Sequence, residues 1–155
     1  MKGVHMRYLL ALCMLTLFST ACSDDPISIT VNPAQYSDDA QAPPPDGWQQ
    51  VKFAGSPRGR AGAYLVRQEP LFTEFNIIEF RGAGQAIAVR LNAYSLKKLG
   101  EFAADPTNLK KPLAVNINGR WADFMPLLEA PKDRMILYGF TEEEKVQLRR
   151  YIDNK

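Results

Sequence analysis

The stretch that decides the fold runs from Leu113 to Phe140 and reads LAVNINGRWADFMPLLEAPKDRMILYGF. Residues 113–117 alternate between large apolar and smaller or polar side chains, a pattern typical of a strand that buries one face. The Asn118-Gly119 pair then tolerates the positive φ angles of a tight hairpin turn. The chain returns through residues 121–128 and, after a turn, enters a third apolar run at 135–138. Three consecutive sheet segments are therefore predicted to form the core.

Short extended runs and two amphipathic helices flank this stretch. A helix is predicted after Asn92, which suits an N-cap, because apolar residues recur every three or four positions until Asp105-Pro106 ends the pattern. A second helix is predicted from Thr141, since Thr141 and Glu144 have the spacing of a capping box. The other strand candidates are residues 50–54, 63–67, 75–80 and 86–91.

The first 21 residues predict a secretory signal peptide. Lys2 and Arg7 form a positive region that precedes an apolar run at residues 8–18. Small residues follow at 19–21. The apolar run is too short to span a bilayer as a permanent helix. We therefore expect residues 1–21 to be removed during secretion.

Cys22 directly follows the small residues, and this arrangement resembles the lipobox of bacterial lipoproteins. In that family the cysteine becomes the first residue and carries several acyl chains, which give stable anchoring. Ser19 departs from the pattern, which usually has Leu at that place, and plain cleavage that leaves a free Cys22 is the alternative. Without the leader Cys22 is the only cysteine, so no intramolecular disulfide can form. The resemblance implies lipidation of Cys22 and a membrane as a partner.

The residue after the cysteine bears on localisation. In enterobacterial lipoproteins an Asp at that position retains the protein in the inner membrane, whereas this sequence has Ser23. The resemblance therefore implies an anchored protein that faces the periplasm, in the outer membrane rather than the inner membrane.

Residues 22–47 are predicted to be the lipidated cysteine and a flexible tether, with the folded domain spanning residues 48–155. The segment is rich in Ser, Asp, Pro and Ala, and its proline run at 43–45 favours polyproline II. Residues 27–31 show a brief β-like pattern, but the prolines that bracket them permit at most an edge strand.

The charge balance gives no reason to expect a nucleic-acid partner. The whole chain has 19 Lys and Arg against 17 Asp and Glu, and removal of Lys2 and Arg7 with the leader leaves 17 of each sign. The basic excess that a phosphate backbone attracts is thus absent from the mature chain.

The sequence also lacks the parts of a common active or metal site. Its only histidine, His5, lies in the predicted leader, and the single mature cysteine is expected to be acylated. A catalytic triad, a Cys–His pair and the usual metal sites all need at least one of these residues. We expect no enzymatic activity, no cofactor and no metal.

Two groups of residues are candidates for contact with a partner. Trp121, Phe124 and Met125 follow the hairpin turn, and some of them would be exposed if the sheet buries only one face; simple core packing is the alternative. Arg58 and Arg60 lie in a predicted loop and could hold a phosphate or a lipid headgroup, although two solvated charges explain them as well.

Several segments together resemble the periplasmic head region of SecD, a subunit of the bacterial protein-export machinery. The similarity covers roughly residues 63–152. The matching motifs are Glu69-Pro70, Leu113-Ala114-Val115, Asn118-Gly119 and Gly139-Phe140-Thr141-Glu142-Glu143-Glu144. The sequence departs from the family after the hairpin, where Ala122-Asp123-Phe124 replaces serine-alanine-proline, and at Lys132-Asp133, which replaces a glycine pair.

This resemblance implies an α+β fold: a two-layer α/β sandwich of ferredoxin-like type, with a mostly antiparallel sheet and two helices on one face. With the lipobox, it implies a membrane-anchored, non-catalytic interaction domain whose partners are envelope proteins, with the export machinery as one candidate. A lipoprotein that binds a small lipid or glycan in a groove over the sheet is the alternative. The oligomeric state does not follow from the sequence.

Overall fold

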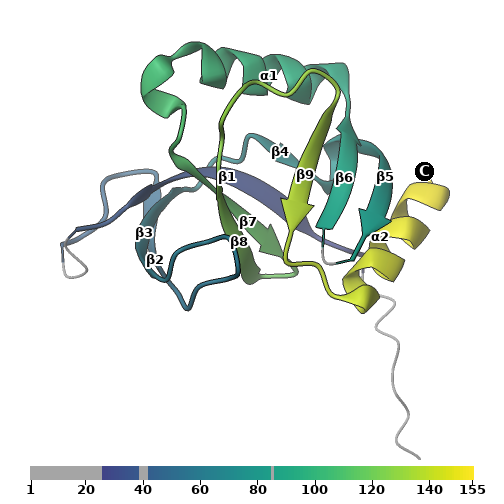
Figure 1. Cartoon of the computed structure of the whole chain (residues 1–155), viewed down its shortest axis with the longest axis horizontal. Coiled ribbons are helices and arrows are strands. Elements are labelled where there is room, and N and C mark those ends of the chain that lie inside the picture. The colour runs from purple at the N-terminus through teal and green to yellow at the C-terminus, as the bar shows by residue number, and fades with distance from the viewer. Residues whose placement is uncertain (1–25, 39–41, 85) are drawn as a thin grey trace, which may run out of the picture.

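A computed structural model of the chain describes residues 26–38, 42–84 and 86–155 (Figure 1). The predicted signal peptide and Cys22 lie outside these residues. The strands are β1 Ile29–Tyr36, β2 Trp48–Phe53, β3 Gly62–Arg67, β4 Phe72–Thr73, β5 Ile77–Ala83, β6 Ala86–Leu91, β7 Pro112–Ile117, β8 Arg120–Pro126 and β9 Arg134–Tyr138. The helices are α1 Ala93–Ala104 and α2 Glu142–Asp153, and the 3₁₀ turns are η1 Glu74–Asn76 and η2 Pro106–Asn108. The described strand pairs are all antiparallel, which confirms the α+β class and the antiparallel pairing.

The larger of two sheets has the strand order β2-β3-β1-β7-β8, with β4 paired to β1, and it curls into a half-barrel (Figure 1). At its centre the predicted hairpin is present. Asn118 and Gly119 have φ angles of 51° and 82°, as the tight turn between β7 and β8 requires.

Strand β1 shows that the predicted tether is wrong for residues 29–36. This segment lies between β3 and β7 in the sheet, and Ile29 and Val31 are fully buried. The strand tolerates Pro33, which has no backbone N–H, because of the way β1 pairs with β7. Because the Asn118 N–H donates to the Ser28 carbonyl, Pro33 falls at a position that needs no N–H toward β7. On its other side β1 changes partner from β4 to β3 at this point.

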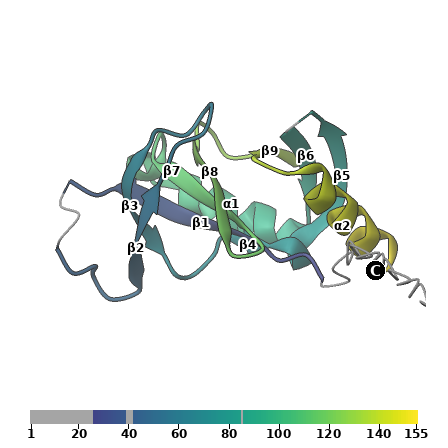
Figure 2. The ribbon, with the colours of Figure 1, turned by 90° about the horizontal axis from the view of Figure 1, so that it is seen from below.

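The smaller sheet has the order β5-β6-β9, and it corrects a second prediction. The predicted fold has one mostly antiparallel sheet, which would include the run at 135–138. This run instead forms β9, which pairs with β6 through Met135 opposite Val89 and Leu137 opposite Ile87. Residues 113–140 therefore contribute strands to two different sheets. The two sheets lie side by side along the long axis of the molecule (Figure 2).

The core consists of two apolar clusters on opposite sides of β7. Leu113 and Val115 belong to the main cluster, which also contains side chains of the smaller sheet and of both helices. Ala114 belongs to the second cluster, inside the half-barrel with Phe53 and Phe124. Both faces of β7 are therefore buried, and the predicted single buried face is wrong.

Both predicted helices are confirmed together with their caps. The Asn92 side chain accepts the N–H of Ser95 at the start of α1, and Thr141 and Glu144 form the capping box of α2. The helices do not cover one face of a single sheet: α2 packs beside β5, while α1 lies across another side of the molecule (Figures 1 and 2). Two sheets in this strand order do not support the ferredoxin-like prediction. None of the helices among the described residues is long and apolar enough to cross a membrane.

Candidate binding groove

Two strand edges that pair with no other described strand face each other across the middle of the molecule. Strand β8 is the last strand of the larger sheet and β9 is the last strand of the smaller one. Residues 127–133 join them in an arch near α1 (Figure 1). The arch is held at its start, because the Lys110 N–H donates to the Leu127 carbonyl and the Leu127 N–H donates to the Lys111 carbonyl.

The two edges meet at one end and separate toward the arch. They meet where Gly139 lies against Ala122: a β-carbon at position 139 would come within 2.6 Å of the Ala122 carbonyl oxygen. Ala122 is an extra residue in β8, because Val115 pairs with Asp123 while Asn116 pairs with Trp121. Such a bulge bends its strand and redirects the following side chains.

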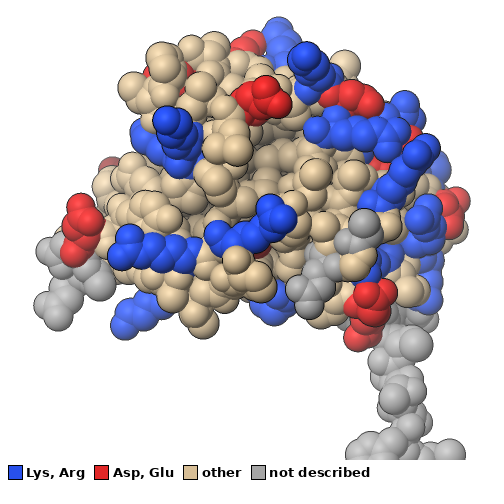
Figure 3. All heavy atoms as spheres, in the orientation of Figure 1, with Lys and Arg blue, Asp and Glu red and all other residues tan. Residues whose placement is uncertain are grey.

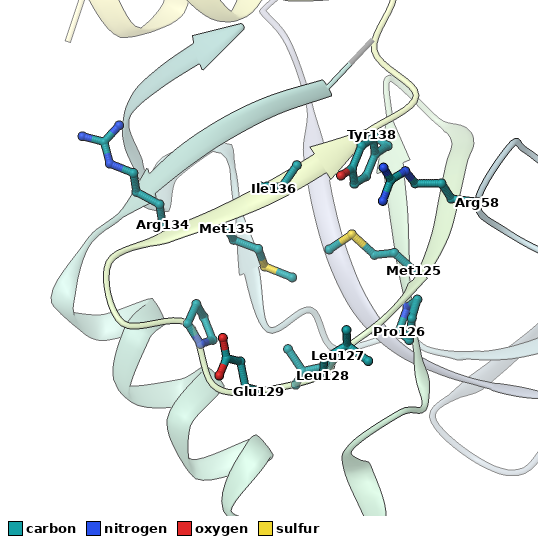
Figure 4. A pocket seen from close by; sticks show the side chains of 11 residues that line it. Arg58, Met125, Pro126, Leu127, Leu128, Glu129, Arg134, Met135, Ile136 and Tyr138 are labelled. Carbon is teal, nitrogen blue, oxygen red and sulfur yellow. The ribbon is translucent and has the colours of Figure 1, made fainter. Parts of the chain in front are cut away.

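An open groove with a volume of about 520 Å³ lies between the separated edges. Its lining is mainly apolar, and Met125 from β8 and Met135 from β9 point toward one another within it (Figure 4). Leu128 and Ile136 also line it and are 69% and 51% exposed, so the groove presents apolar surface to solvent. The surface at the centre of this face is hollowed and largely uncharged, with Lys and Arg side chains around it (Figure 3). Flexible methionine side chains adapt to apolar ligands of different shapes.

Two arginines line the groove and differ in their surroundings. Arg134 lies 3.4 Å from Asp133 and 3.7 Å from Glu79, so carboxylates already neutralise it. The Arg58 guanidinium instead lies 4.2 Å from the centre of the Tyr138 ring, a cation–π contact (Figure 4). Among the described residues no carboxylate forms an ion pair with Arg58.

The residues predicted from sequence as contact sites come together only in part. Arg58 and Met125 both line the groove, although Met125 is 7% exposed. Phe124 is buried in the second cluster, where its ring centre lies 4.0 Å from that of Tyr64, and it is a core residue. Trp121 is half-buried beside Phe124. Arg60 lies elsewhere, over the Tyr36 ring at 5.8 Å, beside a separate hollow of about 280 Å³.

Sequence reasoning missed most of the groove. Leu128, Ile136 and Tyr138 look like ordinary residues of an arch and a strand, because nothing local marks β9 as an edge. The same holds for Asp123, although an acid between apolar residues of a predicted strand was a usable signal. The described residues contain no cluster of three or more His, Cys, Asp or Glu that could hold a metal ion.

Comparison with solved structures finds a similar fold in SecDF. No family model matches the sequence, and a search of curated proteins finds no match. A structure of SecDF, described as a membrane component that enhances protein export, is similar over 84% of this chain and 64% of its own, with a TM-score of 0.51 and 14% identity. A crystal structure of SecDF in a super-membrane-facing form is similar over 81% of this chain and 18% of its own, with a TM-score of 0.49 and 14% identity.

At this level of identity the likeness shows the fold alone. The domain has a fold similar to the periplasmic region of SecDF, and the chain spans 64% of the length of the first SecDF chain. The predicted resemblance to SecD is thus confirmed for the fold, and activity and partners are separate questions.

Proposed function

We propose that this chain is a lipid-anchored protein of the bacterial cell envelope whose domain binds an extended segment of a partner protein in the groove between β8 and β9. The observation that carries the proposal is the pair of unpaired strand edges on either side of an apolar groove. No catalytic step is assigned to the domain.

Strand addition is the binding mode that this geometry favours. An edge strand presents a row of N–H and C=O groups that an extended peptide can pair with. In such complexes the main-chain hydrogen bonds provide affinity, and pockets for alternate side chains provide specificity. The groove offers main-chain groups along β8 and β9, and its apolar lining includes Met125 and Met135, with Ile136 on the other face of β9.

The choice of partner class rests on the fold and on the leader. A fold similar to that of the periplasmic region of SecDF is consistent with a role beside export or envelope assembly, and the partners we propose are envelope proteins. The lipobox-like sequence at Cys22 supports an anchor in the membrane, and Ser23 supports the outer membrane.

The groove is tested with synthetic nonapeptides of alternating valine and serine, whose binding is followed by fluorescence anisotropy. We expect Ile136→Ser to weaken binding about threefold or more, because it removes apolar contact in the groove. Val146→Ser is the matched control, since Val146 is similarly exposed (57% against 51%) but lies on α2. Equal binding by both variants would remove the groove as the site.

The anchor is tested separately by metabolic labelling with a radioactive fatty acid. Wild type should incorporate label, and Cys22→Ala should not. Equal labelling of the two proteins would contradict the lipid anchor while leaving the groove untouched.

A small apolar ligand is the second candidate occupant, and the volume of the groove is the observation that favours it. A volume of 520 Å³ lies within the range of about 300–1,000 Å³ typical of small-molecule sites. Peptides methylated on alternate backbone nitrogens distinguish the two. Methylation removes the donors that strand addition needs, so it should abolish peptide binding. If methylated peptides bind as well as their parents and lysophospholipid displaces both, the groove is a lipid site.

A further inference from the structure

A small pocket of about 120 Å³ adjoins the groove and shares Arg58 and Tyr138 with it. Its other walls come from the loop before β3 and from the narrow end of the groove, including Ser56, Asp123 and Gly139. At roughly 30 Å³ per water molecule the space equals about four waters. It therefore has room for the end of one side chain or for a molecule of similar size, and not for a drug-sized ligand.

Asp123 is the most unusual residue of this pocket. It is fully buried, and one carboxylate oxygen, Oδ1, accepts the hydroxyl of Ser56 at 2.6 Å. Gly59 packs over that same oxygen, since a β-carbon there would come within 2.8 Å of it. The other oxygen, Oδ2, is buried and accepts no hydrogen bond from any described residue. A buried carboxylate with an unused oxygen is costly unless a donor or a cation compensates it.

A second part of the pocket lining, Tyr138, is also suited to a cation. The face of the Tyr138 ring already holds a guanidinium, that of Arg58, at 4.2 Å. Arg58 is exposed and extends from a loop, and it does not reach Asp123 closely enough for an ion pair. An aromatic ring and a buried carboxylate thus line one small space, together with the chain's own Arg58.

We propose that this pocket binds the ammonium group of a lysine side chain carried by the polypeptide in the groove. The inference rests on the proposed groove function and adds to it a preference for a basic residue. An ammonium is compact and has three donors, so it can donate to Asp123 Oδ2 while it contacts the Tyr138 ring. Arg58 competes for the same place, and the lysine displaces it.

Pairs of peptides test this preference. The full-length protein is expressed in bacteria and purified, and it is reconstituted in nanodiscs if it carries lipid. One lysine is moved along the valine–serine nonapeptide, and each peptide has a twin with norleucine in that position. We expect one register to bind wild type more tightly with lysine. Arg58→Ala should raise that preference severalfold by removing the competing cation. Arg60→Ala is the matched control, because it removes an arginine of the same loop that lies over Tyr36.

Asp123→Asn tests the carboxylate and keeps the shape and the contact with Ser56. It should abolish the preference for lysine, a loss of about tenfold, which is typical of a hydrogen bond to a charged group. Its folding is checked by thermal unfolding. If Asp123→Asn does not fold, the comparison of lysine and norleucine peptides on Arg58→Ala decides whether the pocket binds lysine. Equal binding of lysine and norleucine peptides to Arg58→Ala would overturn the proposal.

A small probe separates this proposal from the groove itself. n-Butylammonium should shift the amide NMR signals of Asp123 and Gly139 in Arg58→Ala, and n-butanol should not. Shifts with the amine but no peptide binding would show that the pocket is a cation site and that the groove proposal fails. Peptide binding without a preference for lysine and without these shifts would show that the groove binds peptides and that the pocket is not a cation site.

Discussion

The backbone N–H of Ile29 donates to the carboxylate of Glu74 at 2.8 Å, in the interior of the domain and across 45 positions of sequence. Ile29 is the first residue of β1, and Glu74 opens η1. This bond fixes the point at which the chain enters the larger sheet. It shows that the chain is part of the domain from Ile29 onward, within the stretch that was predicted to be a tether.

Glu74→Ala should destabilise the domain by about 2 kcal/mol, because it leaves the Ile29 N–H buried without an acceptor. The measurement is urea unfolding followed by circular dichroism. Glu101→Ala is the control: its carboxylate is exposed and pairs with Lys97 at 3.8 Å, so its loss should change the free energy of unfolding by less than about 0.5 kcal/mol. Similar losses in both variants would show that Glu74 does not hold β1.

The parts of the fold that sequence reasoning predicted correctly depend on neighbours in the chain. The turn at Asn118-Gly119 and the caps at Asn92 and Thr141 are made by residues within four positions of one another. Turn and cap residues act through local backbone geometry, so their types alone are informative.

The parts that it missed depend on contacts between distant segments. The apolar run at residues 135–138 predicts a strand, but it does not predict that this strand pairs with β6 and not with β8. In the same way, Ser56 and Asp123 lie 67 positions apart, and each is unremarkable until the folded chain brings them together. Arg58 and Met125 were both predicted as contact residues, yet only the split between the two sheets places them in one groove.

Gly139→Ala should test the narrow end of the groove. Gly139 has a φ of 85°, which costs a residue with a β-carbon about 1 kcal/mol, and the new methyl would also collide with the Ala122 carbonyl. We expect a total loss of about 3 kcal/mol in chemical denaturation. Gly119→Ala separates the two effects, because Gly119 has nearly the same φ of 82° with no atom within 4 Å of the added carbon. It should lose only about 1 kcal/mol.

Equal losses at positions 139 and 119 would mean that β8 moves away from β9 without resistance. The contact between Gly139 and Ala122 would then not define the end of the groove.

Tyr64→Phe gives a prediction about pH. Burial, aided by a hydrogen bond with Tyr36, raises the pKa of Tyr64 above its ordinary value of 10.0, and its hydroxyl donates to the Arg60 carbonyl at 2.6 Å. Because the folded state holds the proton more tightly, this stabilisation is complete below pH 10. It is lost as the pH rises through 10 toward the higher pKa of the folded state.

Near pH 7 we therefore expect Tyr64→Phe to be less stable than wild type by about 1 kcal/mol, the contribution of the lost hydrogen bond. The difference should narrow above pH 10, where wild type loses stability through Tyr64 and the variant does not. Urea unfolding at pH 7, 9 and 10.5 measures it. Tyr94→Phe, at an exposed position of α1, is the control. A difference that stays constant to pH 10.5 would contradict the raised pKa.

The short connection between Cys22 and the domain gives a prediction about orientation on the membrane. Residues 23–26 separate Cys22 from the buried Ile27, and at about 3.6 Å per residue they span no more than about 18 Å. The acylation that we propose for Cys22 would therefore hold this end of the domain close to the bilayer. Phe75 lies at the same end, because it follows Glu74, the partner of Ile29, and its ring contacts Tyr151 of α2. Strand β2, with the exposed Lys52, lies at the opposite end (Figure 2).

A fluorophore on Phe75→Cys should therefore be quenched by lipids that carry a quencher on the headgroup, and one on Lys52→Cys should not. Phe75 is 67% exposed, so the substitution and the label should leave the fold intact. Insertion of a twenty-residue Gly-Ser linker after Ser23 should abolish the difference, because a flexible chain of that length allows the domain to tumble freely. If Phe75→Cys and Lys52→Cys are quenched equally before the insertion, the domain is not held by its N-terminal end, whatever the state of Cys22.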